Sequence, residues 1–267
     1  MVPPDPEPSH LDPTSAVADE TASRPLSARL EPPPERIGRL LIFATVAGLV
    51  AGVASELIGE RILNSYKSNL LPPLEINPSA ENVRRWKDAR VYTATFTFAT
   101  LGGLLGLALG IAGGLARRSV VASSLAATLG LVVGSVSVGF LSLALVTYFY
   151  KLFDPISSDL VLPLLTHSAI WSTVGAIAGL AFGLGIGGRG RWIVTLGGGL
   201  AGAVMATVIY EIVGAIAFAS SKTEMPLSAS VATRALALLL VASLSSVGAV
   251  LALHQATRKK GKTPVSS

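Results

Sequence analysis

The chain has 267 residues, of which 51% are hydrophobic and only 14% are charged, and its mean hydropathy is +0.61. This composition excludes an ordinary soluble domain, because long uncharged stretches separate short basic or mixed clusters. The net charge of +5 is spread over the ends of apolar stretches, which is typical of topology signals and lipid head-group contacts rather than of nucleic-acid binding. The chain has no cysteine, which excludes disulfides, thiolate metal sites and cysteine nucleophiles.

Residues 1–36 are rich in Pro, Ser, Glu and Asp, as in the run Glu-Pro-Pro-Pro-Glu at 31–35. Such a segment buries too little apolar surface to offset the entropy of ordering, so we predict a disordered cytoplasmic tail. No apolar run begins before about Leu40, and a cleaved signal peptide is therefore not expected.

Six apolar stretches follow, and each is long enough to cross a hydrocarbon core of about 30 Å as a helix. We therefore predict an all-α integral membrane domain over residues 37–255, followed by a basic C-terminal tail over residues 256–267. The predicted spans lie near residues 38–60, 91–115, 120–149, 160–187, 192–219 and 227–254.

The longest connection, residues 61–90, is predicted to be an extracytoplasmic loop. Its mixed polar stretch after Asn77-Pro78, which includes Trp86, favours a short helix that lies at the membrane surface and runs into the second span. An ordinary surface loop with one helical turn is the alternative.

Lys and Arg residues predict the orientation of the domain. The short connections near residues 117–118 and 189–191 are basic, as is the C-terminal tail, and this pattern favours both termini in the cytoplasm, although the first loop is also basic. The lack of eukaryotic targeting signals favours the bacterial inner membrane as the location.

An internal repeat relates the second and fourth spans, which match in one ungapped register. The matched pairs include Thr93 with Thr166, Gly102 with Gly175, Gly106 with Gly179, Gly110 with Gly183 and Arg118 with Arg191. The sixth span fits the same frame more weakly, with Thr233 at the place of Thr166, and the odd spans share a Gly-xxx-Gly pattern. The pattern predicts three tandem helical hairpins, and coincidence within a composition dominated by Gly, Ala and Leu is the alternative.

Two glycine ladders, with a glycine at every fourth residue, lie in the second and fourth spans. Residues four apart share one face of a helix, and a glycine face permits the close backbone approach that holds helices together in lipid. We predict seams that face the core of the monomer, and a homo-oligomer interface is the alternative. The eight glycines are Gly102, Gly106, Gly110, Gly114, Gly175, Gly179, Gly183 and Gly187.

Four ionisable residues, Glu56, His167, Glu211 and Arg234, lie within the predicted spans. A charge at the centre of a bilayer costs about 3 kcal/mol or more, so each is a candidate functional residue. At a rise of about 1.5 Å per residue, all four fall in the outer half of the bilayer at similar depth. His167 and Arg234 directly follow threonines that the repeat makes equivalent.

These four residues allow two interpretations. In the first, they form a polar pocket open to the extracytoplasmic side, where Arg234 holds an anionic group while His167 and a carboxylate exchange protons. In the second, Glu211 and Arg234 form a structural ion pair that fastens the third hairpin, and Glu56 reaches the head-group region.

Motifs for catalysis are missing from the sequence. It has no Gly-x-Ser-x-Gly elbow, no His-Glu zinc motif and no phosphate-binding loop, and no histidine has a partner at metal-ligand spacing. We therefore predict no enzyme, no cofactor, no metal and no nucleic-acid partner, with the lipid bilayer as the surroundings. The favoured function is a structural or assembly component of the membrane, and the alternative is a transporter or channel for a small anionic solute.

Overall fold

A computed structural model describes residues 37–70, 79–153, 161–218, 221, 223–228 and 230–260. Its six long helices are each long and apolar enough to cross a membrane, which confirms the predicted all-α fold. The predicted disordered tail at 1–36 lies outside the described residues. The long helices are α3 (Ile37–Ser65), α5 (Ala80–Ala116), α6 (Val120–Leu152), α7 (Val161–Ile186), α8 (Arg191–Ala217) and α9 (Val231–Lys260), and α4 (Lys67–Leu70) is a single turn.

The helices extend further than the predicted spans at several ends. The predicted loop of residues 61–90 is largely helical, because α3 continues to Ser65 and α5 begins at Ala80. Ser79 caps α5 by accepting a hydrogen bond from the Asn82 amide, and an ion pair at i,i+4 spacing between Glu81 and an arginine supports the first turns. The polar stretch therefore continues into the second span as one helix, and its place at the membrane surface stays a prediction. At the other terminus, α9 runs to Lys260 and includes the start of the predicted basic tail.

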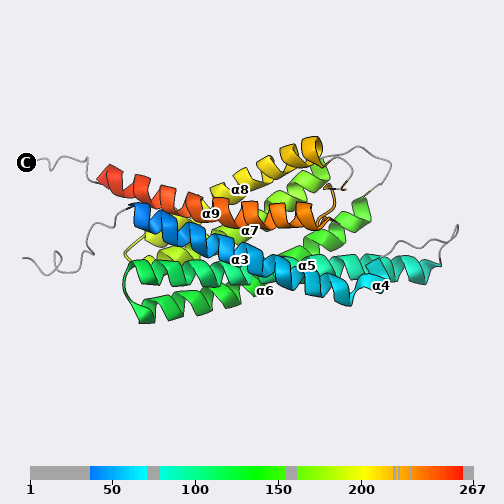
Figure 1. The fold of residues 1–267 in the computed structure, drawn as a ribbon, viewed down its shortest axis with the longest axis horizontal. Helices are drawn as coiled ribbons and strands as arrows, with labels where there is room; N and C mark the ends of the chain where they lie inside the picture. The colour runs from blue at the N-terminus through cyan, green and yellow to red at the C-terminus, as the bar shows by residue number, and fades with distance from the viewer. Residues whose placement is uncertain are drawn as a thin grey trace, which may run out of the picture. The chain divides into compact units, whose positions relative to one another are not determined.

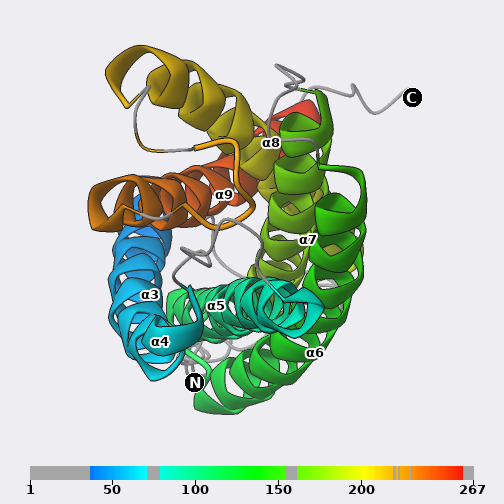
Figure 2. The same cartoon turned by 90° about the vertical axis from the view of Figure 1, so that its right-hand side faces the viewer.

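The described helices belong to one compact unit, in which α5, α7 and α9 are inner helices and α3, α6 and α8 are outer ones. Between 50% and 67% of the most apolar stretch of each inner helix is buried, against 28% to 33% for the outer helices. Each outer helix packs between two inner ones: α3 between α9 and α5, α6 between α5 and α7, and α8 between α7 and α9 (Figures 1 and 2). The bundle therefore closes on itself where α9 meets α3.

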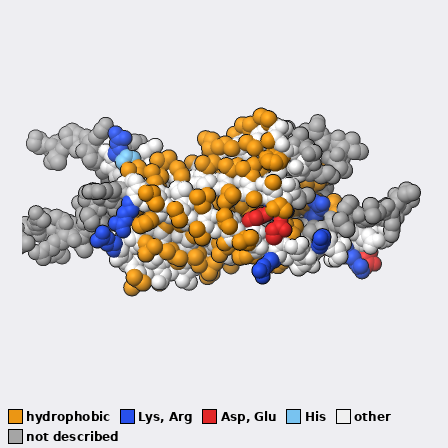
Figure 3. Space-filling model, in the orientation of Figure 1, with side chains coloured by type: hydrophobic (Ala, Val, Ile, Leu, Met, Phe, Trp, Pro, Cys, Tyr) orange, Lys and Arg blue, Asp and Glu red, His pale blue; other side chains and the backbone are white. Residues whose placement is uncertain are grey.

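Apolar side chains cover the outside of the bundle. Figure 3 shows hydrophobic side chains across the middle of one face of the bundle, with Lys and Arg side chains toward both ends. A few acidic side chains lie at the right-hand border of the hydrophobic region in this view. On α6, the exposed apolar residues include Val121, Leu125 and Phe140. Such a surface fits contact with lipid chains.

The glycines of both ladders lie where helix backbones approach most closely. A Cβ on Gly106 would collide with the backbone of Gly130 in α6, and a Cβ on Gly179 would collide with the backbone of Thr195 in α8. The other ladder glycines within α5 and α7 make the same kind of contact, those of α5 with α6 and those of α7 with α8. The two ladders thus face neighbouring helices of the same chain.

Gly187 differs from the other seven glycines of the ladders. Helix α7 ends at Ile186, and Gly187 follows it with a φ of +73° beside the side chain of Arg117. The packing role predicted for Gly187 within the helix is therefore wrong, and its role is the left-handed conformation that commonly ends a helix. We call the end of the bundle that holds the short connections at residues 117–119 and 187–190 the turn end. The opposite end of the bundle is the loop end.

Candidate functional site

Helix α3 brings two glutamates to α9 on one face. Gly48, Gly52, Glu56 and Glu60 are each four residues apart, so their side chains follow one another along the helix. Gly48 and Gly52 lie against α9, where a Cβ on either would meet Ala242. The two carboxylates continue this contact toward the loop end.

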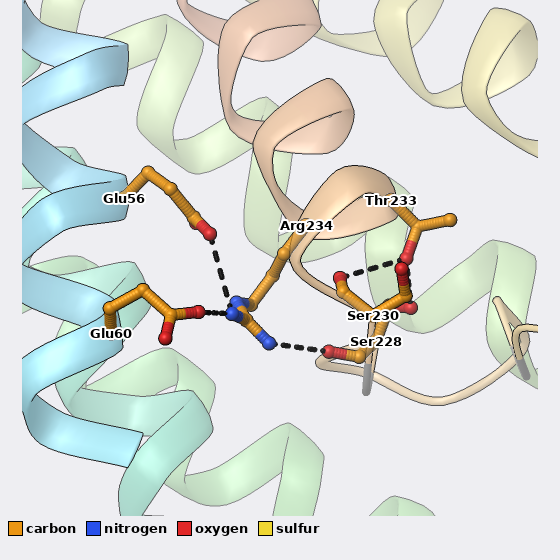
Figure 4. Close-up of polar contacts among 6 residues, drawn as sticks. All are labelled: Glu56, Glu60, Ser228, Ser230, Thr233 and Arg234. Atoms are coloured by element: carbon orange, nitrogen blue, oxygen red, sulfur yellow. Dashed lines mark hydrogen bonds and ion pairs between the residues drawn. The ribbon is translucent and has the colours of Figure 1, made fainter. Parts of the chain in front are cut away.

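Arg234 on α9 lies between these carboxylates and the connection that precedes its own helix (Figure 4). Its Nη2 atom donates to Oε1 of Glu56 at 3.3 Å and is also paired with Glu60, while Nη1 donates to the carbonyl oxygen of Ser228 at 3.2 Å. Arg234 is only 3% exposed and Glu56 9%, whereas the Glu60 side chain is 33% exposed. A buried guanidinium of this kind requires such partners, because an unpaired charge in the interior is costly.

His167 on α7 is the centre of a second polar cluster. The ring is 1% exposed and its two nitrogens face two acceptors: Nδ1 lies 2.6 Å from Oε1 of Glu211 on α8, and Nε2 lies 3.2 Å from the carbonyl oxygen of Met225. The ring of Trp171 stacks on it with centroids 5.1 Å apart, and Tyr210 meets it edge-on at 5.8 Å. Packing against the rings of Trp171 and Tyr210 fixes the orientation of the imidazole.

The two clusters meet at the α8–α9 segment, by which we mean residues 221, 223–228 and 230. Met225 and Ser228 are 8% and 4% exposed, so this connection is folded into the bundle and not over its surface. Its carbonyl oxygens accept from His167 at Met225 and from Arg234 at Ser228. The Ser228 hydroxyl is in turn bonded to the hydroxyl of Thr233 and donates to the carbonyl of Ser221 at 3.3 Å.

The predicted structural pair between Glu211 and Arg234 is wrong. Glu211 is paired with His167, and the described ion pairs of Arg234 are with Glu56 and Glu60. Glu56, which the same interpretation left without a partner, is buried and paired with Arg234 of α9, and its depth in the bilayer stays a prediction. The four candidates therefore form two clusters and not one pocket.

Glu60 and the α8–α9 segment belong to the candidate site, and the sequence interpretation missed both. The signal for Glu60 was present, because it continues the Gly48, Gly52 and Glu56 face at the same spacing. For Glu211 the structure shows that Thr195 and Gly199 of the same helix also lie against α7, which carries His167. No sequence pattern indicated that the segment is buried or that Met225 offers a carbonyl oxygen to His167.

The chemistry of these clusters is that of paired charges between helices. Two carboxylates surround one guanidinium in the first cluster, so it offers more acceptor than donor capacity and is poorly suited to hold an anion. In the part of the chain that the structure describes, no three His, Cys, Asp or Glu side chains gather as a metal site would require. Comparisons with protein-family models, with curated proteins and with solved structures give no match for this chain.

Proposed function

We propose that the protein is a non-enzymatic structural or assembly component of the bacterial inner membrane, with both termini in the cytoplasm. The observation that carries this proposal is that the buried charged groups bind one another across helices. Arg234 joins α9 to α3, and His167 joins α7 to α8. Each joint links helices of different predicted hairpins, so the charges serve to hold the bundle closed.

The arginines at the turn end support the proposed orientation. Arg117, Arg118, Arg189 and Arg191 lie in its two short connections or at the adjoining helix start, and basic residues in short connections are retained on the cytoplasmic side. The loop end, with both polar clusters close to it, then faces the extracytoplasmic side.

A transporter for a small anionic solute finds less support. Such a function would use the Arg234 guanidinium as the anion site, yet that group already faces Glu56 and Glu60 and donates to a backbone carbonyl. An entering anion would have to displace a carboxylate and would then lie beside two negative charges. We therefore do not propose this alternative.

Thermal unfolding in detergent with a panel of small anions and cations tests the proposal. We expect no saturable stabilisation of the wild-type protein by any solute, and we expect proteoliposomes to show no flux above that of empty vesicles. Saturable stabilisation by an anion that Arg234→Gln removes, while the variant remains folded, would overturn the structural role in favour of transport.

A further inference from the structure

The two contacts of the His167 ring, with Glu211 and with Met225, together require one proton more than a neutral histidine beside an ionised glutamate has. The carbonyl of Met225 can only accept, so Nε2 must carry a hydrogen. The second contact, from Nδ1 to Oε1 of Glu211, is 2.6 Å long and also needs a hydrogen between the two atoms. Either the ring carries both protons beside a carboxylate, or a neutral ring accepts from a protonated carboxyl group.

We propose that His167 and Glu211 form a proton-binding site, and that the proton they share latches the α8–α9 segment into the loop end of the bundle. With the proton in place, the ring is held so that its Nε2–H donates to Met225. Without it, the one proton left on the neutral ring lies on Nδ1, where it is shared with the ionised Glu211, and Nε2 then presents a lone pair to the Met225 carbonyl, which is repulsive. The Met225 carbonyl, which is buried, would then lose its donor and favour leaving the interior.

The proton can exchange with water at Glu211. The His167 side chain is 1% exposed, whereas the Glu211 side chain is 21% exposed, so the carboxylate is the open side of the pair. Opening transfers the shared proton to water at this carboxylate and leaves a neutral imidazole and an ionised Glu211. The closed state binds one proton more than the open state, and raising the pH therefore favours opening.

Other groups near the site do not supply this proton in place of Glu211. Tyr210 on α8 meets the His167 ring edge-on, and the negative charge of Glu224 in the segment interacts electrostatically with Tyr210. Arg234 on α9 holds the same segment at Ser228, and at this end α5 and α6 contribute Arg90 and Tyr150, which bond to each other. Arg234 is thus a second, proton-independent hold on the segment, so opening should be local to Met225 and its neighbours.

The absence of native cysteine makes thiol labelling a direct test. Met225→Cys keeps the backbone carbonyl and places a reporter at a position that is 8% exposed. Its reactivity toward a membrane-impermeant maleimide is measured over a pH series and divided, at each pH, by that of the same protein in denaturing detergent. Val120→Cys, at a site that is 77% exposed, controls for changes unrelated to the segment.

We expect the relative reactivity at position 225 to rise about tenfold or more with increasing pH, as for the loss of one hydrogen bond to a charged group. Glu211→Gln keeps the latch without an exchangeable proton, because its amide can donate to Nδ1, so its reporter should stay protected at every pH. His167→Ala should leave the reporter reactive at every pH. In case this variant does not fold, His167→Gln, which cannot share a proton, should give a pH-independent signal.

Two results would overturn the proposal: the same pH profile with Glu211 and with Gln at position 211, or a reporter in the His167→Ala protein that is as protected as in its parent. Neither result would bear on the structural role of Arg234, which is tested by unfolding and not by labelling.

Discussion

Removal of the Arg234 side-chain charge should be among the most destabilising single substitutions in this chain. Arg234→Met keeps a long apolar stem and removes the guanidinium, which leaves Glu56 buried without its partner and Glu60 beside it. Breaking a buried ion pair by removing one partner costs about 3–5 kcal/mol, because the remaining charge is left uncompensated. We expect a loss in this range for the free energy of unfolding, measured by denaturant titration in mixed micelles.

A double-mutant cycle separates the pair from other effects of the substitution. In the Glu56→Gln background the buried carboxylate is already neutral, so Arg234→Met should cost less there, with a coupling of about 2–3 kcal/mol. Glu60→Gln should couple more weakly, because the Glu60 side chain is 33% exposed and water screens its charge.

A surface pair provides the matched control. Arg84 and Asp88 form an ion pair at 3.7 Å on α5, with side chains that are 83% and 55% exposed. Removing either charge should change the free energy of unfolding by about 0–1 kcal/mol. If the Arg234 and Glu56 substitutions add to within about 0.5 kcal/mol, the two residues are not coupled and the role assigned to them is wrong.

Two further predictions concern packing and orientation. Gly106→Ala should destabilise the protein by about 1–3 kcal/mol, since its Cβ would collide with the backbone of Gly130. Gly197→Ala, whose Cβ would meet nothing within 4 Å, should be neutral or stabilise by up to about 1 kcal/mol. A similar loss of stability at both sites would contradict the packing argument. Single cysteines at Val120 and Val161 should be labelled from opposite sides of the membrane, with position 161 reacting in intact spheroplasts, and labelling of position 120 from outside would reverse the proposed topology.

The sequence was sufficient to predict the helices because lipid imposes a simple rule on a spanning segment. Backbone groups must bond within the helix and side chains must be apolar, so length and composition alone locate all six spans. The polar stretch from Ala80 to Arg90 was predicted as a short helix that runs into the second span, and it forms the first turns of α5, whereas α9 extends past the predicted end of the sixth span. Hydropathy reports the depth of a residue and not the end of its helix, and the internal repeat also stays a prediction.

Partners of the buried charges depend on which helix faces which, and hydropathy does not contain this information. Because all four residues lie at similar depth, depth alone allowed Glu211 to pair with Arg234. The faces of the helices decide instead that Glu211 pairs with His167 and that Arg234 pairs with Glu56. In the structure, Gly199 and Glu211 of α8 both contact α7, Gly199 at Gly175 and Glu211 at His167. The buried position of Met225 could not be predicted, because short connections normally lie at the surface.

The contacts between α5 and α6 keep one register along much of the two helices. Gly106 meets Gly130 and Gly102 meets Gly134, and further toward the loop end the rings of Trp86 and Tyr150 are in contact, with centroids 6.2 Å apart. Stepping four residues at a time from these contacts places Ala94 opposite Ser142. Ala94 occupies the place in the predicted repeat that His167 and Arg234 occupy in α7 and α9. Among the described residues, no ion pair links α5 to α6.

Ala94→Ser therefore tests whether the contact between α5 and α6 can accept a polar interaction like those between α9 and α3 and between α7 and α8. The Ser142 hydroxyl is fully buried and has no hydrogen-bond partner among the described residues, and a serine at position 94 would supply one. Hydrogen bonds between membrane helices contribute about 0.6 kcal/mol on average, so we expect Ala94→Ser to stabilise the protein by an amount of this order. In the Ser142→Ala background the gain should vanish, because the new hydroxyl would itself be buried without a partner. Equal effects of Ala94→Ser in both backgrounds would show that the two positions do not face each other, and the register argued from Gly102 and Trp86 would then be wrong.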